Sequence, residues 1–256
     1  MDWGRRLCAW ASEGSNVRRS AMVSVAIGLI IILGCAGGLA YACIIPSSHV
    51  FHPVVNRGPA ESRNVVLTFD DGPAPPFTEQ VLDILAEHGI RATFFLCGKN
   101  VERYPELARR IVREGHTIGN HTYSHPFLFG KSRRFMAGEI DRAQEAIERV
   151  TGVRPTLFRP PYGARWFGLV PTLSERGLRM VMWSVMGFDW KYKARAIIWA
   201  IKSRLHSGAV VLLHDGHEQP PPAGVDQSAT VQALPAIIET ATRSGLTFAP
   251  IEKFLA

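Results

Sequence analysis

Hydrophobic positions along residues 63–256 alternate between short and long segments. Short runs rich in β-branched and aromatic residues predict strands at 65–69, 92–96, 117–120, 156–158, 180–185, 209–213 and 247–251. Longer stretches between them predict helices at 77–88, 104–114, 131–150, 170–176, 194–205 and 230–243. This alternation predicts an α/β domain, with about seven parallel strands and helices outside the sheet. Periodicity alone leaves open whether the sheet is an incomplete, distorted barrel or an open sheet.

A second feature of the pattern is the uncharged apolar run at residues 21–45. It exceeds the roughly 20 residues that a helix needs to cross the hydrocarbon core of a membrane. Four arginines precede the run, at Arg5, Arg6, Arg18 and Arg19, whereas Arg57 and Arg63 are the only ones shortly after it. The excess of positive charge on the amino-terminal side predicts a cytoplasmic amino terminus and an extracytoplasmic remainder.

A cleaved signal peptide is the alternative reading of the same run. Ala40-Tyr41-Ala42 resembles a small-residue cleavage site, and Cys43 directly after it raises the alternative of a lipid-modified chain. Signal peptides have apolar regions of roughly 7–15 residues, which is shorter than this run. We therefore favour a retained anchor over secretion after cleavage near Ala42.

The chain is thereby divided into four parts. Residues 1–20 form a basic cytoplasmic tail and residues 21–45 the transmembrane segment. Residues 46–62 mix Pro, Ser, His, Asn and Gly without periodicity, which is typical of a linker, and residues 63–256 form the α/β domain.

Composition narrows the class of partner. The hydrophobic and charged fractions, 46% and 20%, are those of an ordinary globular protein. The net charge is +7, but Arg residues lie between Glu residues on helical stretches, as over residues 102–114, which indicates solvated faces rather than a nucleic-acid surface. The four cysteines are too far apart to predict a disulfide framework or a thiolate metal site. No obligate protein partner is indicated.

Candidate chemistry follows five of the predicted strands. The carboxyl ends of parallel strands gather at one edge of an α/β fold, so residues that follow them are expected to share a pocket. The segments concerned are Asp70-Asp71-Gly72-Pro73, His121-Thr122-Tyr123-Ser124-His125, Arg159-Pro160-Pro161-Tyr162-Gly163, Asp189-Trp190 and His214-Asp215.

Each segment has a plainer reading when it is taken alone. Asp-Asp-Gly-Pro is also a turn, two histidines four residues apart are also surface or core residues, and His214 is also a core histidine. Arg159 before two prolines is also a structural ion-pair partner. Together, however, one carboxylate and two imidazoles supply the ligand set of a catalytic zinc ion with an open position.

These segments, in this order and spacing, resemble all five motifs of the polysaccharide deacetylases (the NodB-homology domain, or carbohydrate esterase family 4). The resemblance covers residues 63–256 and implies a distorted (β/α) barrel. One position departs from the pattern: many members have an acid three residues before the Asp of the fourth motif, where this chain has Met186. The departure concerns the substrate groove.

The resemblance also implies a role for each residue. Asp71, His121 and His125 hold a divalent cation, Zn²⁺ first, with Co²⁺ or another divalent ion as alternatives. Asp70 is the base, oriented by Arg159, and His214 is the acid, held by Asp189. The oxyanion is stabilised by the backbone N–H of Tyr162. Trp190 stacks on a sugar ring and Leu212 lines the pocket for the acetyl methyl group.

The function implied is removal of N-acetyl groups from an amino-sugar polymer, of the peptidoglycan or chitin type, outside the cytoplasm. Two alternatives stay open. One is an esterase acting on O-acetyl groups, as in acetylated xylan, and the other is a catalytically inactive sugar-binding module. The second would require the loss of a catalytic side chain, and none of those named is missing.

Overall fold

The computed structural model describes residue 22 and residues 26–50, 54–217 and 227–255. The chain forms two compact units, Met1–Ala42 and Cys43–Ala256, which are treated separately. The predicted cytoplasmic tail, residues 1–20, lies outside the described residues. The apolar run contains the 19-residue helix Ala26–Ile44, whose mean hydropathy is 2.3. By length and composition this helix can cross a membrane, a test that a signal sequence also passes.

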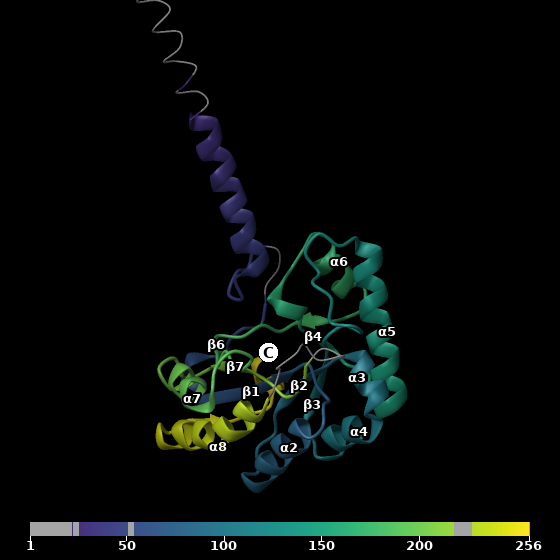
Figure 1. Ribbon diagram of the computed structural model, residues 1–256, viewed down its shortest axis with the longest axis vertical. Helices are drawn as coiled ribbons and strands as arrows, with labels where there is room; N and C mark the ends of the chain where they lie inside the picture. Colours follow the sequence, from purple (N-terminus) through teal and green to yellow (C-terminus); the bar gives the residue numbers. More distant parts are fainter. Residues whose placement is uncertain (1–21, 23–25, 51–53, 218–226, 256) are drawn as a thin grey trace, which may run out of the picture. The chain divides into compact units, whose positions relative to one another are not determined.

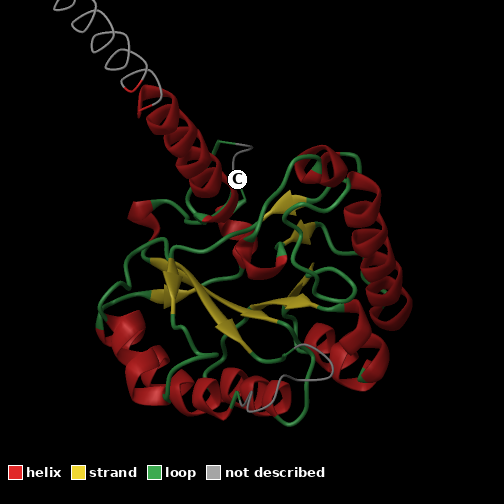
Figure 2. Cartoon of the chain, turned by 45° about the horizontal axis from the view of Figure 1, so that its top comes forward, coloured by secondary structure: helices red, strands yellow, loops and turns green. Residues whose placement is uncertain are grey.

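The second unit is built on a curled parallel sheet (Figures 1 and 2). Its strands run in the order β5-β4-β3-β2-β1-β7-β6, and β8 pairs with the start of β1. Their bounds are β1 Asn64–Asp70, β2 Thr93–Leu96, β3 Thr117–Asn120, β4 Leu157–Phe158, β5 Arg179–Met180, β6 Val185–Met186, β7 Val210–His214 and β8 Thr247–Phe248. Strands β5 and β6 are consecutive in the chain yet lie at opposite edges of the sheet. The predicted incomplete (β/α) barrel is confirmed.

The single strand predicted at 180–185 is wrong, because two short strands and a connecting segment replace it. The connection does not continue the ladder for two reasons. Arg159 takes the backbone carbonyls of Val181 and Met182. The backbone of Val55 also pairs there, accepting a hydrogen bond from Met182 at 2.8 Å and donating one to Met180 at 3.1 Å. Residues from the segment predicted as a linker therefore pair beside the sheet.

The six predicted helices are all present, with ends that differ by a few residues, and α3 is an addition. Helix α5 begins after Ser132, whose hydroxyl accepts a hydrogen bond from the Phe135 backbone N–H, and ends at the left-handed Gly152. The bounds are α2 Phe77–Glu87, α3 Gly98–Arg103, α4 Pro105–Arg113, α5 Arg133–Thr151, α6 Leu169–Ser174, α7 Ala194–Lys202 and α8 Ser228–Arg243, with 3₁₀ turns η1 Ala60–Ser62, η2 Pro161–Gly163 and η3 Ile251–Phe254.

The two faces of β1 explain how the fold reaches the site. Val65, Leu67 and Phe69 are buried against the surrounding helices, each contributing roughly 1.5–3 kcal/mol by burial. Because successive side chains alternate, Thr68 and Asp70 point to the opposite face, inside the curled sheet. A hydrophobic strand thus ends by placing an acid in the interior.

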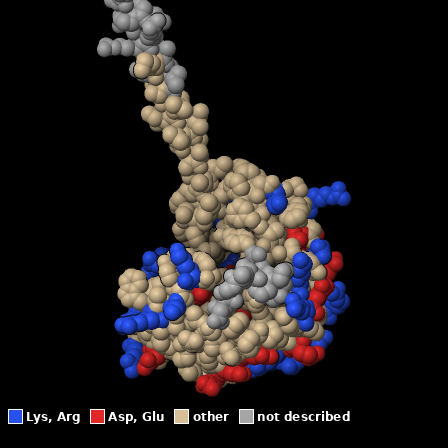
Figure 3. Space-filling model, viewed as in Figure 1, with Lys and Arg blue, Asp and Glu red and all other residues tan. Residues whose placement is uncertain are grey.

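Charged side chains lie on the outer surface of this unit. Figure 3 shows Lys and Arg beside Asp and Glu along the right and lower sides of this unit. Arg110, for example, pairs with both Asp83 and Glu114, at 2.6 Å in each case. The surface of α4 thus carries paired charges, as expected for a solvated helix face.

Candidate active site

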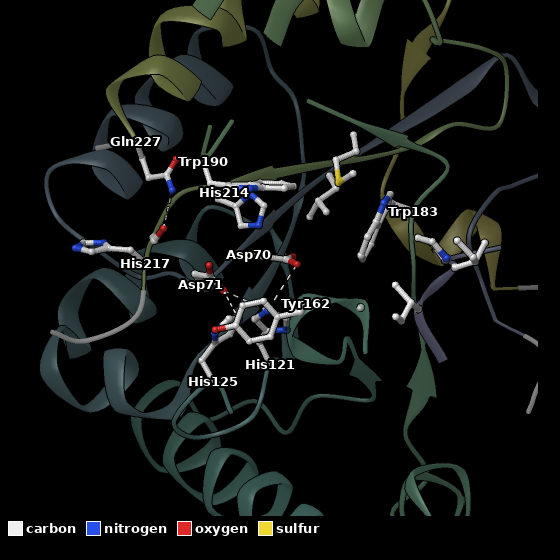
Figure 4. Close-up of a pocket in the computed structure, with 17 residues that line it drawn as sticks. Asp70, Asp71, His121, His125, Tyr162, Trp183, Trp190, His214, His217 and Gln227 are labelled. Carbon is white, nitrogen blue, oxygen red and sulfur yellow. Dashed lines mark hydrogen bonds and ion pairs between the residues drawn. The ribbon is translucent and has the colours of Figure 1, made fainter. Parts of the chain in front are cut away.

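The predicted residues meet at the carboxyl ends of the strands in a pocket of about 660 Å³ (Figure 4). Its lining includes Asp70, Asp71, His121, His125, Tyr162, Trp190, Leu212 and His214. The other two predicted residues, Arg159 and Asp189, are buried and contact pocket residues directly. The structure thus brings together the whole set.

Asp71, His121 and His125 form a compact triad. The Nε2 atoms of His121 and His125 lie 3.2 and 3.1 Å from Oδ1 of Asp71. Burial by itself raises the Asp71 pKa, but the neighbouring His125 and His121 hold it well below its usual value of 3.8. The carboxylate is therefore ionised and faces two imidazole nitrogens.

These atoms fit a divalent cation. Oδ1 of Asp71 is buried and has no hydrogen-bond partner, and the three potential ligand atoms lie within 4.8 Å of one another. Nδ1 of His121 lies 2.7 Å from the backbone carbonyl of Arg159, which only accepts, so Nδ1 donates there and Nε2 is the ring nitrogen that faces Asp71. One carboxylate and two imidazoles match the ligand preference of zinc.

Asp70 lies beside the triad but is held differently. Its Oδ1 accepts a hydrogen bond from Nη1 of Arg159 at 2.6 Å, and its Oδ2 faces Nε2 of His121 at 3.7 Å. Asp70 ends β1, whereas Asp71 follows it with a positive φ of 72°, so the two carboxylates are held differently although both lie near Nε2 of His121. The structure therefore separates an arginine-paired carboxylate from the carboxylate of the triad.

Arg159 is fully buried and satisfied on several sides. Its guanidinium donates to Thr68 and Asp70 and to the backbone carbonyls of Val181 and Met182, and it stacks on the ring of Phe95 at 4.1 Å. A buried guanidinium stays charged, so these acceptors fix its direction. Its orientation fixes that of Asp70.

His214 pairs with Asp189 on the other side of the pocket. Nδ1 of His214 lies 2.8 Å from Oδ1 of Asp189, whose Oδ2 accepts from the Thr230 hydroxyl at 2.7 Å. Burial opposes a charge on His214, but the attraction and hydrogen bond of Asp189, aided by Asp71 and Asp70, raise its pKa to about 10. The imidazole is therefore protonated at neutral pH.

The three predicted substrate residues line the same pocket. The Tyr162 side chain is 55% exposed and its ring lies 4.7 Å from that of His125. Trp190 is 50% exposed and meets His214 edge-on, whereas Leu212 is buried. Met186, at the position that departs from the family pattern, also lines the pocket.

Backbone strain is concentrated at this site. Six described residues other than glycine have a positive φ. One is Arg63, and the other five lie in the segments of the site, with values between 54° and 72°: Asp71, Thr122, His125, Tyr162 and Phe188. Such conformations cost roughly 1–3 kcal/mol each in residues other than glycine and persist only where the surroundings hold them. The packing that stabilises the domain thus aims Asp71 and His125 at one point.

Sequence reasoning missed residues that support the predicted set. Thr68 and Thr230 bond Arg159 and Asp189, and Trp183 lines the pocket. The hydroxyl side chains of Thr68 and Thr230 gave no motif of their own. The alternation of side chains along β1 places Thr68 on the same face as Asp70, and this was the only feature of the sequence that could have indicated a role for Thr68.

Asp215 was also left without a role. It is fully buried, and burial raises its pKa to about 7 despite a 2.5 Å hydrogen bond from Thr78. A Cβ on Gly72 would come within 2.3 Å of this carboxyl group, so the Asp-Asp-Gly turn closes directly on it. The Asp215 backbone N–H donates to the carbonyl of Asp70 at 3.2 Å. Asp215 therefore braces the turn that carries the two acids.

Comparison with known proteins decides the family. A peptidoglycan-N-acetylglucosamine deacetylase of Bacillus cereus is 38% identical over 195 residues, which is 75% of this chain and 68% of the relative. Residues 57–181 match the family model described as Polysaccharide deacetylase. The chain belongs to the polysaccharide deacetylase family. The predicted resemblance is confirmed.

Other polysaccharide deacetylases match over the same region. A chitooligosaccharide deacetylase of Bradyrhizobium sp. is 38% identical over 200 residues, covering 74% of this chain and 90% of the relative. The peptidoglycan-N-acetylglucosamine deacetylase PgdA of Listeria monocytogenes is 39% identical over 175 residues, and the matched part covers 36% of its length. Relatives of both substrate types are thus similar to this chain.

Solved structures agree with the fold. The crystal structure of a peptidoglycan N-acetylglucosamine deacetylase in complex with 4-naphthalen-1-yl-N-oxidanyl-benzamide is 36% identical, with a TM-score of 0.73, covering 78% of this chain and 91% of that chain. A family pseudoenzyme from Bacillus anthracis is 27% identical, with a TM-score of 0.71 and coverages of 78% and 68%. The fold therefore occurs with and without activity, and activity has to be argued from the side chains.

Proposed function

We propose that this chain is a membrane-anchored, metal-dependent deacetylase that removes N-acetyl groups from an amino-sugar polymer outside the cytoplasm. The observation that carries the proposal is the pairing of two independently held groups across one pocket, Asp70 fixed by Arg159 and His214 fixed by Asp189. Relatives named for peptidoglycan and chitooligosaccharide deacetylation support this substrate class.

Asp71, His121 and His125 are the residues that would hold the cation. A divalent ion there, Zn²⁺ first among them, would supply Lewis acidity to the acetamide carbonyl and to the attacking water. Its identity is part of the proposal.

Asp70 acts as the general base. Arg159 occupies Oδ1, so Oδ2 is the oxygen that faces the triad and takes the proton of the attacking water. The hydrogen bond from Arg159 keeps this carboxylate oriented. A positioned base of this kind contributes roughly 10²–10⁴ in rate.

His214 acts as the general acid. Asp189 holds Nδ1, which leaves Nε2 to carry the proton that the departing sugar amine receives. An amine leaves poorly without a proton, so this transfer is needed when the tetrahedral intermediate collapses. The protonated state of His214 fits the role.

The remaining pocket residues bind the substrate. The backbone N–H of Tyr162 would stabilise the developing oxyanion, and the exposed face of Trp190 would stack on a sugar ring. Leu212, buried on the pocket wall, would contact the acetyl methyl group.

Acetate release by the full-length protein in detergent, supplied with zinc, tests the function. We expect release from peptidoglycan or chitooligosaccharides, with one free amine formed per acetate, and a rate roughly 10²–10⁴ times lower in the Asp70→Asn variant. Release from acetylxylan alone would show an O-acetyl esterase. Glycan binding without acetate release from any substrate would show an inactive module.

The membrane topology is proposed on the apolar run at residues 21–45 and the arginines before it. The second compact unit, Cys43–Ala256, would then be extracytoplasmic, and it includes the residues predicted as a linker. The mass of the protein purified from membranes tests the retained anchor. An intact mass is expected, and a mature chain that begins at Cys43 would contradict it.

A further inference from the structure

One wall of the active-site pocket comes from a part of the chain outside all five motifs. Ile44, Ile45 and Pro46 line the same pocket as Asp71 and His214. The side chains of Ile44 and Ile45 are 51% and 38% exposed, so both present apolar surface to it. All three residues belong to the second compact unit, Cys43–Ala256.

Arg165 holds this wall in place. Its Nη1 donates to the carbonyl of Ser48 at 2.7 Å, its Nη2 donates to the carbonyl of Ile45, and its backbone N–H donates to the carbonyl of Cys43 at 2.9 Å. Residues 45–48 form a turn, closed by a 3.0 Å hydrogen bond from the Ser48 N–H to the Ile45 carbonyl. The guanidinium therefore binds the segment mainly through its backbone.

The contact between Arg165 and residues 43–48 is buried. Arg165 and Ser48 are each 1% exposed. A buried guanidinium cannot lose its charge and needs acceptors, and carbonyls that lose a buried donor are left unsatisfied. Neither side of this contact can be removed without the other losing its partner.

Arg165 also belongs to a loop that carries residues of the active-site pocket. Arg165 lies two residues after Gly163 and three after Tyr162, both of which line the pocket. Within the loop 159–165, Arg159 donates to Asp70 and Arg165 donates to the wall. The position of the wall is thus tied to the position of the proposed base.

We infer that Arg165 is a positioning residue, which fastens residues 43–48 as a substrate-contacting wall of the active site. The inference rests on the proposed function. An aliphatic wall suits the C–H face of a sugar ring or its acyl substituent, whereas the hydroxyl groups would face the polar side of the pocket. Because residues 43–48 precede the predicted domain at 63–256, a chain that begins at residue 63 would lack this part of the site.

Steady-state kinetics of the full-length protein in detergent test the inference, with a chitooligosaccharide as substrate. We expect Arg165→Gln and Ile45→Ala each to raise KM about tenfold and change kcat less than about threefold. Arg165→Lys should recover part of the loss, because an ammonium still reaches one carbonyl. The double variant should be no worse than Arg165→Gln alone, since both changes remove the same wall.

Two matched controls separate this effect from general destabilisation. Arg176→Gln removes a partly buried arginine, which bonds Asp141 and the Thr172 carbonyl. Val50→Ala shortens an exposed side chain just beyond the wall. Both should keep the KM of the unmodified protein. An unchanged KM in Ile45→Ala, or additive effects in the double variant, would overturn the inference. If Arg165→Gln does not fold, Ile45→Ala decides alone, and absence of activity in the unmodified protein would count against the proposed function instead.

Discussion

Asp189 holds His214 through both carboxylate oxygens. Oδ1 lies 2.8 Å from the ring Nδ1, and Oδ2 accepts the His214 backbone N–H at 2.7 Å. The ring cannot rotate away without breaking the first contact, and the strand end cannot shift without breaking the second. A buried acid thus fixes both the direction and the charge of the imidazole.

The pH dependence of turnover should report this pair. His214 acts in its protonated form, so activity is present below its pKa and lost as pH rises through it. Asp189 raises that pKa towards about 10, and a bound cation would repel the imidazolium and bring it lower. In Asp189→Asn the alkaline limb should move to lower pH, towards the ordinary value near 6.5, while the rate falls. A pH profile of kcat/KM measures the shift. An alkaline limb at the same pH in Asp189→Asn would show that Asp189 does not raise the pKa of His214.

Removing the acid should matter only for poor leaving groups. His214→Ala should lose roughly 10²–10⁴ of the rate on an N-acetyl substrate, because the amine then departs without a proton. On an acetyl ester of an activated phenol the loss should be small, since that group leaves as an anion. Parallel assays of the two substrates measure the ratio. Equal losses on both would show that His214 is not the acid.

A supporting contact gives a smaller, graded effect. Thr230→Val removes the hydroxyl that donates to Oδ2 of Asp189 and should lower kcat/KM by up to about tenfold, because Asp189 is then held less firmly against His214. Thr242→Val on the same helix is the control, because its hydroxyl bonds the backbone carbonyl of Ile238. Identical kinetics in both variants would contradict a role for Thr230.

Stability should depend strongly on the buried arginine of the site. Arg159→Met leaves Asp70 as an unpaired buried charge, and loss of one partner of a buried pair costs about 3–5 kcal/mol. Arg176→Met, at a partly exposed ion pair with Asp141, should cost about 0–1 kcal/mol. Urea unfolding measures the difference in the free energy of unfolding. Equal losses in the free energy of unfolding would show that the Arg159–Asp70 pair does not stabilise the fold more than the partly exposed pair does.

The sequence predicted the site better than its surroundings. Strand ends are recognisable because the apolar run of β1 stops at Asp70-Asp71 and that of β7 at His214, and parallel strands bring their carboxyl ends together. The convergence of these residues followed from topology, before any atomic position was known. Their chemical roles remain proposals, to be tested by the variants described here.

The parts that the sequence left out depend on tertiary contacts. Residues 181–184 have a strand-like composition, but Arg159 and Val55 take the backbone groups that a continuous strand would use. Residues 54–58 resemble a linker by composition, yet Val55 and Arg57 pair with Val181 and Ala209. The grip of Arg165 on Ile45 and Ser48 spans more than a hundred residues and leaves no periodic trace. Contacts between residues far apart in the sequence cannot be predicted from the local pattern of hydrophobic and polar residues.

The most direct test of the account compares two neighbouring carboxylates. Asp71→Asn and Asp70→Asn are matched changes of one oxygen to an amide nitrogen, made at a triad ligand and at the proposed base. Each full-length variant is incubated with zinc and desalted, and zinc per chain is measured by mass spectrometry beside acetate release. We predict that Asp71→Asn loses zinc and activity together, whereas Asp70→Asn keeps its zinc and loses roughly 10²–10⁴ of the rate. Equal zinc loss in both variants, or full activity in Asp70→Asn, would contradict the division of labour on which the proposed mechanism rests.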